Sequence, residues 1–159
     1  MVREKNIKTL YHYNSIRQIV KASKQNDIEA INLISDSLAF YIQNNHLKGC
    51  LIAVPSSKKS TETIAKNIAL KINKPFCNSL FKFNAPSNCQ LRIKTDSRKY
   101  LSVMEIMKYI RVRKYPKSKN IILIDDVSTS GNTFKACCQI LKGYNIKCIA
   151  FANGSRKSW

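Results

Sequence analysis

The sequence predicts an α/β fold in a single domain, with a mainly parallel sheet flanked by helices. Helical and strand patterns alternate along the chain without a repeat, a low-complexity tract or a clear linker. The continuous apolar run at residues 121–124 is typical of a strand that is buried on both faces. A length of 159 residues suits one domain with a sizeable core. We therefore expect one domain over residues 1–159, with N-terminal helices in 1–48 and the core in 49–159.

Spaced apolar residues define the expected elements of the first half. Apolar side chains three or four positions apart predict helices around residues 16–20 and 31–41. A buried strand is expected at 50–54, since an apolar run there follows a glycine and ends at a proline. Isoleucines at every fourth position predict an amphipathic helix over 64–72 that closes before Pro75.

The second half continues the alternation. Residues 76–83 are expected to form a strand, and 101–110 a helix that ends at a basic turn over 111–120. After the strand at 121–124, the apolar positions of 134–141 predict another helix, which Gly143 is placed to end. Residues 146–152 read as the last strand. Both helices and strands are therefore expected on either side of the run at 121–124.

The most informative motif follows that run. Asp125 and Asp126 are expected to emerge at the carboxyl edge of the parallel sheet, where ligands bind in open α/β sheets. The next residues offer hydroxyls and backbone N–H groups at a helix N-terminus, which favours a phosphate: Thr129, Ser130, Gly131, Asn132 and Thr133. Ribose hydroxyls or Mg²⁺ would satisfy the carboxylates. The motif predicts a site for a phosphorylated sugar. A solvated strand end or a receiver-like acidic pocket is the alternative, and neither needs this turn.

This segment resembles the signature of type I phosphoribosyltransferases, which bind 5-phosphoribosyl-1-pyrophosphate. The resemblance implies that Asp125 and Asp126 hold the ribose 2′ and 3′ hydroxyls as the catalytic acids. It assigns the 5′-phosphate to the turn from Thr129 to Thr133. Ser128 departs from the family, which usually has an aliphatic residue there.

The polar loop after Pro55 corresponds to the family's pyrophosphate-binding loop. The resemblance assigns four residues to it: Ser56, Ser57, Lys58 and Lys59. Phosphoribosyl transfer releases pyrophosphate, whose charge lysines and Mg²⁺ stabilise as the bond breaks. Mg²⁺ is therefore the implied cofactor, with Asp125 and Asp126 as candidate ligands through water. The plainer interpretation is an ordinary exposed polar loop in a lysine-rich chain.

Nearly the whole chain is similar to the ComF-like, competence-associated branch of this family. The shared features are the helix pattern at 16–20 with a nearby Lys24, and a strand that ends at Val54 and Pro55. The branch also implies a lid at about 84–100, which contains Lys94, Thr95 and Arg98. Members commonly have Gln in place of Arg98 and often carry an N-terminal zinc module, which this sequence does not contain.

The net charge of +19 exceeds what a pyrophosphorylated sugar needs. A strongly basic surface attracts nucleic acid through counterion release. The alternative is compositional, because lysine, isoleucine and asparagine are all abundant. The six cysteines form no Cys-x-x-Cys pair and sit mostly in apolar runs, so we expect reduced, buried thiols.

No apolar run approaches the roughly 20 residues of a membrane span, and the charged start lacks the apolar core of a signal peptide. We therefore expect a cytoplasmic protein with no membrane association. The leading hypothesis is a Mg²⁺-dependent phosphoribosyltransferase that uses phosphoribosyl pyrophosphate or a nucleotide and an unidentified acceptor. Alternatives are a non-catalytic protein of nucleic-acid handling, such as DNA uptake, and a sensor of phosphoribosyl pyrophosphate. A homodimer is compatible with all three.

Overall fold

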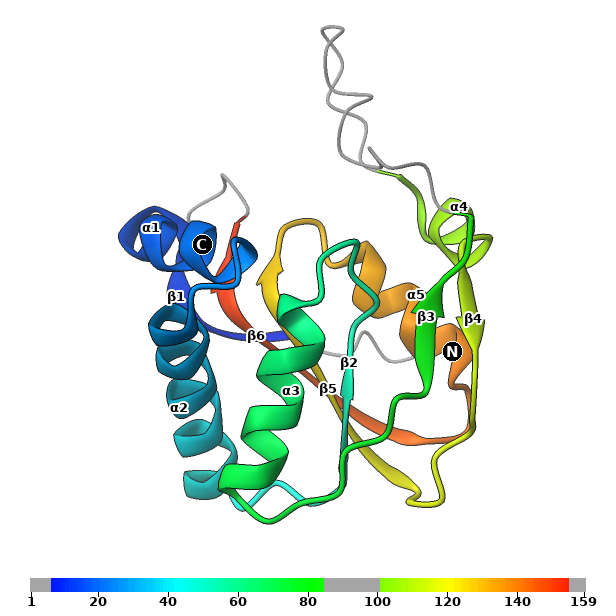
Figure 1. The fold of residues 1–159 in the computed structure, drawn as a ribbon. Helices are drawn as coiled ribbons and strands as arrows, with labels where there is room; N and C mark the ends of the chain where they lie inside the picture. Colours follow the sequence, from blue (N-terminus) through cyan, green and yellow to red (C-terminus); the bar gives the residue numbers. More distant parts are fainter. Residues whose placement is uncertain (1–6, 85–100, 155–159) are drawn as a thin grey trace, which may run out of the picture.

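The computed structural model describes residues 7–84 and 101–154 (Figure 1). The elements follow one another in the order β1 (Ile7–His12), α1 (Tyr13–Lys24), α2 (Ile28–Asn44), β2 (Cys50–Ala53), α3 (Ser60–Lys71), β3 (Leu80–Lys82), α4 (Val103–Met107), β4 (Ile110–Val112), β5 (Asn120–Ser128), α5 (Asn132–Ile140) and β6 (Asn145–Asn153). The fold is α/β in one domain, as the sequence predicts.

The strands form two sheets. The larger one has the order β1-β6-β5-β2, and all of its neighbouring strands are parallel. β3 and β4 form a separate antiparallel ribbon. Gly49 begins the approach to β2 with a φ of 136°, and a Cβ there would lie 2.6 Å from the carbonyl oxygen of Asn120. The glycine thus allows β2 to pair closely with β5.

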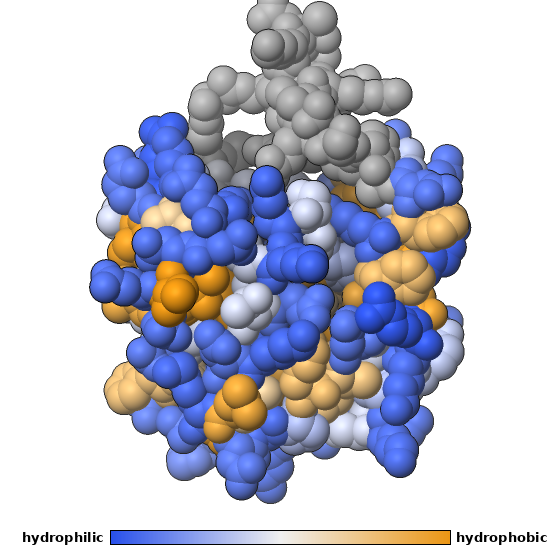
Figure 2. Space-filling model, viewed as in Figure 1, coloured by the Kyte–Doolittle hydropathy of each residue, from blue (hydrophilic) through white to orange (hydrophobic). Residues whose placement is uncertain are grey.

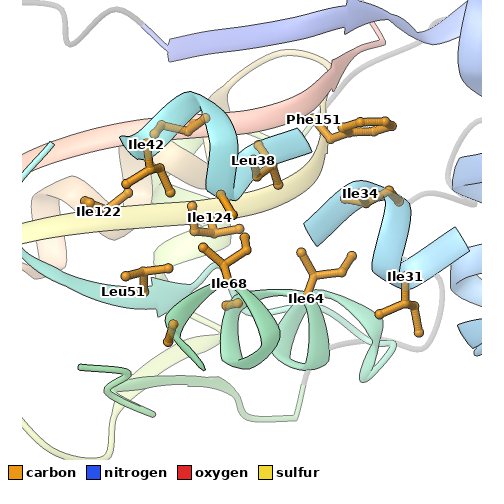
Figure 3. Packing of buried hydrophobic residues seen from close by; sticks show 14 of the residues in the cluster. Ile31, Ile34, Leu38, Ile42, Leu51, Ile64, Ile68, Ile122, Ile124 and Phe151 are labelled. Carbon is orange, nitrogen blue, oxygen red and sulfur yellow. The ribbon is translucent and has the colours of Figure 1, made fainter. Parts of the chain in front are cut away.

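One face of the larger sheet carries α1, α2 and α3. Side chains from both strands and helices interlock there, as Figure 3 shows for Leu38, Leu51, Ile68, Ile124 and Phe151. All five are at most 1% exposed. The apolar side chains of α2 and α3 therefore pack on the sheet, as their spacing in the sequence predicts.

The opposite face carries α5 and the β3–β4 ribbon. Alternate residues of β5 and β6 point to this side, so Leu123 and Cys148 pack with Phe134, Cys137 and the ribbon. Burial raises the pKa of the Cys137 thiol, with smaller contributions from the charges of Cys138 and Asp125. The buried thiol stays protonated, as expected for a core cysteine.

The structure corrects the predictions for four elements. β1 and β4 were not expected, and β4 occupies residues that were assigned to the end of a helix and a basic turn. The expected helix at 101–110 is only the five-residue α4. β5 continues past the apolar run through Ser128, so the two acids lie inside the strand rather than beyond it. Among residues 7–84 and 101–154, no helix is long and apolar enough to cross a membrane.

Candidate functional site

The candidate site lies where β5 loses one of its two neighbours. On one side, β2 pairs with β5 only as far as Ala53 opposite Ile124, where the Val54 N–H donates to the Ile124 carbonyl at 2.8 Å. On the other side, β6 accompanies β5 as far as Ser128, opposite Asn153. Asp125 and Asp126 therefore stand on a strand that is held by β6 but is open on the β2 side.

Consecutive residues of a strand point to opposite faces, and the acid pair follows this rule. Asp126 lies on the face of the helical layer, where Lys24 of α1 approaches it. Asp125 lies on the face of α5, where its charge acts on Cys137. The two carboxylates thus flank the open edge of β5 from both sides.

Local backbone hydrogen bonds fix both carboxylates. Asp125 Oδ1 accepts the Asp126 N–H at 2.9 Å, and Asp126 Oδ1 accepts the Val127 N–H at 2.8 Å. Asp126 Oδ2 is buried and has no hydrogen-bond partner in the part of the chain that the structure describes. Its charge is met by the Lys24 ammonium at 3.5 Å, which is beyond a normal hydrogen bond. This oxygen is an acceptor ready for a donor.

The environment of Asp125 disfavours a charge. Burial raises the pKa of the Asp125 carboxyl well above its usual range, the neighbouring Asp126 raises it further, and Lys24 opposes the shift only weakly. A cation or a set of hydroxyl donors that enters this edge would reverse that balance, because it would stabilise the second carboxylate. The pair is chemically suited to a polyol or a hydrated divalent cation.

The turn after β5 ends in a helix start that lacks a side-chain cap. Gly131 is the N-cap residue of α5 with a φ of 73°, a left-handed conformation that favours glycine. Ser130 Oγ accepts the Asn132 N–H at 3.3 Å, and no acidic residue lies in the first turn. The first N–H groups of a helix point outward with a partial positive charge, so this start can receive an anion.

Two hydrogen bonds and the close approach of Gly154 hold this turn in place. The Asn132 amide donates to the Leu101 carbonyl at 2.8 Å, and the Gly154 N–H donates to the Ser128 carbonyl at 2.8 Å. A Cβ at Gly154 would lie 2.8 Å from the Thr129 methyl group. The exposed hydroxyls of Thr129 and Ser130 thus project from a backbone that is packed on its other side.

The loop after β2 reaches the same edge, because β2 and β5 are parallel neighbours (Figure 1). All four residues assigned to it, Ser56, Ser57, Lys58 and Lys59, are exposed. Ser56 Oγ accepts the Lys58 N–H at 3.2 Å. α3 begins directly after Lys59, and the hydroxyls of Ser60 and Thr61 are buried without a hydrogen-bond partner among the described residues.

Not every assigned residue is placed. Lys94, Thr95 and Arg98, with the lid at 84–100 apart from its first residue, lie outside the described residues. The structure also adds one contact that the sequence did not indicate, which is the approach of Lys24 to Asp126. In the sequence, the position of Lys24 near the helix pattern at 16–20 was the signal for a role of this lysine. Only the packing of α1 on the sheet reveals its target.

Protein side chains alone do not build a metal cage here. Within residues 7–84 and 101–154, no group of three or more His, Cys, Asp or Glu side chains could hold a metal ion. Two carboxylates with one orphaned oxygen do fit a Mg²⁺ ion that keeps several waters and shares phosphate oxygens with a ligand.

Comparison with protein families identifies a relationship over most of the chain. The family model of the phosphoribosyl transferase domain matches residues 26–153. That range includes the acid pair, the turn after β5 and the loop after β2, and it begins just after α1. No curated protein matches the chain significantly.

Proposed function

Because this chain belongs to the phosphoribosyl transferase domain family, we propose that it binds 5-phosphoribosyl-1-pyrophosphate with Mg²⁺ and transfers the phosphoribosyl group to an acceptor. The observation that carries the proposal is the acid pair at the open edge of β5, directly followed by the uncapped start of α5. A sugar phosphate presents hydroxyls and an anion. The chain presents hydrogen-bond acceptors at the acid pair, followed by hydrogen-bond donors at the start of α5.

In this proposal the ribose hydroxyls donate to Asp125 and Asp126. Asp126 Oδ2, which has no hydrogen-bond partner among residues 7–84 and 101–154, gains one from the ribose. During transfer, positive charge develops on the ribose, and two fixed carboxylates stabilise that charge more than they stabilise the ground state. Asp125 therefore acts in its ionised form, which a bound cation favours.

The 5′-phosphate and the pyrophosphate of the substrate are assigned to two helix starts. The turn from Thr129 to Thr133 holds the 5′-phosphate through hydroxyls and the N–H groups of α5. Lys58 and Lys59 neutralise the pyrophosphate, and the buried hydroxyls of Ser60 and Thr61 are further donors at the start of α3. When bound, Mg²⁺ supplies charge neutralisation for the leaving pyrophosphate.

Two finer assignments are part of the proposal. Lys94, Thr95 and Arg98 cover the site as a lid. The chain is a member of the ComF-like branch, supported by the pattern at 16–20 followed by Lys24. The contact between Lys24 and Asp126 gives that pattern a chemical reason, since the lysine stabilises a buried carboxylate of the acid pair. The acceptor of the phosphoribosyl group is to be identified by screening candidate bases.

The test separates catalysis from simple binding. Pyrophosphate release is measured for the unmutated protein with a panel of acceptor bases, and then for Asp125→Asn and Asp126→Asn. The proposal predicts that each substitution lowers turnover by about two to three orders of magnitude, or about 3–4 kcal/mol, with a much smaller change in affinity.

The control is Asp36→Asn, which removes a carboxylate that pairs with Lys71 on the surface between α2 and α3. It should leave turnover unchanged. If no acceptor supports turnover and both acid-pair variants lose affinity alone, the acids form a binding clamp. The protein would then be a sensor or another non-catalytic binder of phosphoribosyl pyrophosphate.

A further inference from the structure

The β3–β4 ribbon has an outer face that the site does not use. Its register places Phe81 opposite Arg111, and Lys82 opposite Ile110. Leu80 and Ile110 are buried in the core, so the alternate residues point away from it. The outer face therefore carries Phe81 and Arg111, with Phe83 and Arg113 two residues further along their segments.

Aromatic rings and guanidinium groups lie against each other on this face. Arg113 stands 5.2 Å from the ring centre of Phe81, and Arg111 stands 5.8 Å from that of Phe83. Phe83 is 49% exposed, so part of its ring is open to a ligand. The Arg111 side chain also donates to the carbonyl oxygen of Lys108 at 2.8 Å, so it is held beside the ring. Flat apolar and flat cationic groups are thus presented together.

The two segments that form and flank the ribbon carry charge of one sign, whereas the adjoining α4 carries the exposed Glu105. Residues 76–84 and 106–124 contain no Asp or Glu, and their basic residues are Lys82, Lys108, Arg111, Arg113, Lys114, Lys117 and Lys119. Six of these seven are exposed, and Lys82 is half-buried. Figure 2, which has the view of Figure 1, shows hydrophobic and strongly hydrophilic residues side by side on the right, where β3 and β4 lie.

We propose that the outer face of the β3–β4 ribbon binds single-stranded nucleic acid. Unpaired bases stack on exposed aromatic rings and guanidinium planes, and the flanking cations track the phosphate backbone. A duplex hides the faces of its bases, so it would gain only the electrostatic part. An acidic protein would match the charge but would not need the exposed rings. This proposal rests on the ribbon and is independent of phosphoribosyl transfer.

The experiment measures fluorescence anisotropy of labelled oligothymidylate and oligouridylate of about 20 nucleotides, a length that exceeds common single-strand site sizes. The ribbon variant is Phe83→Ala with Arg113→Ala. The matched control is Phe40→Ala with Arg17→Ala, an exposed phenylalanine and an exposed arginine on α2 and α1, across the molecule (Figure 1).

We expect the ribbon variant to bind at least about tenfold more weakly, and the control to stay within about twofold of the unmutated protein. The salt dependence of affinity should become shallower by about 0.7 log units per log unit of salt for each lost phosphate contact. If the double variant does not fold, the salt dependence of affinity can be measured with Arg113→Gln alone, because Arg113 is exposed. A preference for one of the two oligonucleotides identifies whether DNA or RNA is the source.

Several results would overturn the proposal. Equal losses in the ribbon variant and the control would mean that the whole basic surface binds diffusely. Tighter binding of a duplex of equal length would exclude base stacking. Absence of binding at about 50 mM salt would exclude nucleic acid as the partner. A ribbon variant that changes only the sedimentation of the protein would identify the face as a contact between copies.

Discussion

The negative charge that the Asp125 carboxyl group can carry conflicts with the environment of that residue. It stands beside Asp126 on a strand, and burial together with that neighbour raises its pKa well above the usual range. A carboxyl group whose surroundings disfavour its charge is stabilised as an ion when a ligand brings compensating groups.

This conflict predicts a pH dependence of stability. The pKa of Asp125 is higher in the folded than in the unfolded protein, so its contribution to stability is fully present below the unfolded value and is lost as pH rises through the folded value. Asp125→Asn removes the charge and keeps the shape. We expect the variant to melt at a higher temperature than the unmutated protein near neutral pH, with the difference shrinking in acid.

The measurement is a series of thermal melts without ligand between about pH 4 and pH 8, a window that starts near the unfolded pKa of a carboxyl group. Asp36→Asn, at an exposed ion pair, serves as the control and should show no such trend. A variant that is less stable than the unmutated protein at neutral pH would show that Asp125 is stabilising as an ion.

At the scale of elements, a comparison of two glycines tests how closely β2 must approach β5. Gly49 and Gly143 both have positive φ angles, of 136° and 97°. A Cβ at Gly49 would meet the Asn120 carbonyl oxygen at 2.6 Å, whereas a Cβ at Gly143 would meet nothing within 4 Å. The two sites share the cost of an unfavourable backbone conformation, and only the first adds a clash with main chain.

We therefore predict that Gly143→Ala costs about 1–2 kcal/mol, from backbone strain alone. Gly49→Ala should cost more than this, because the Asn120 backbone cannot move without loosening the pairing of β2 with β5. Urea unfolding of both variants gives the comparison. Equal losses would mean that the chain relaxes around the new methyl group and that the pairing tolerates a wider spacing.

The elements that the sequence predicted are those with strong apolar spacing. α2, α3, α5 and β6 are confirmed within a few residues, because each buries a continuous face. β1 was missed because it is an edge strand that pairs only with β6, and its exposed residues interrupt the pattern. β4 was missed because three residues in a basic segment carry almost no periodicity. β1 and β4 both form because they pair with another strand, not because of a local sequence pattern.

Over the whole molecule, the topology gathers the assigned residues. Parallel pairing of β2 with β5 brings the loop after β2 and the turn after β5 to one edge, and the resemblance to type I phosphoribosyltransferases assigns both segments to one substrate. The contact of Lys24 with Asp126 could not be predicted, because it depends on how α1 packs over the sheet. The roles of Thr129 and Lys58 in binding stay predictions, and so do those of the lid residues.

The molecule also separates its charges. The chain carries a net charge of +19, yet Asp125 and Asp126 stand together at the site edge, and a basic ribbon packs on the face of the sheet that carries α5. Under the proposed function, the surface as a whole attracts an anionic substrate, and the acids select among anions for those that also bring hydroxyls or Mg²⁺. Overall charge and local chemistry thus act at different steps of recognition.

The most direct test of the central claim is calorimetric titration of the protein with phosphoribosyl pyrophosphate and Mg²⁺, with and without Thr129→Ala and Thr133→Ala together. We predict saturable binding that needs Mg²⁺ and weakens about a hundredfold or more in the double variant, since two hydrogen bonds to a charged phosphate are worth roughly 3–6 kcal/mol at most. Thr9→Ala, in β1, should bind like the unmutated protein. Unchanged affinity in the double variant would contradict the placement of the phosphate at the start of α5.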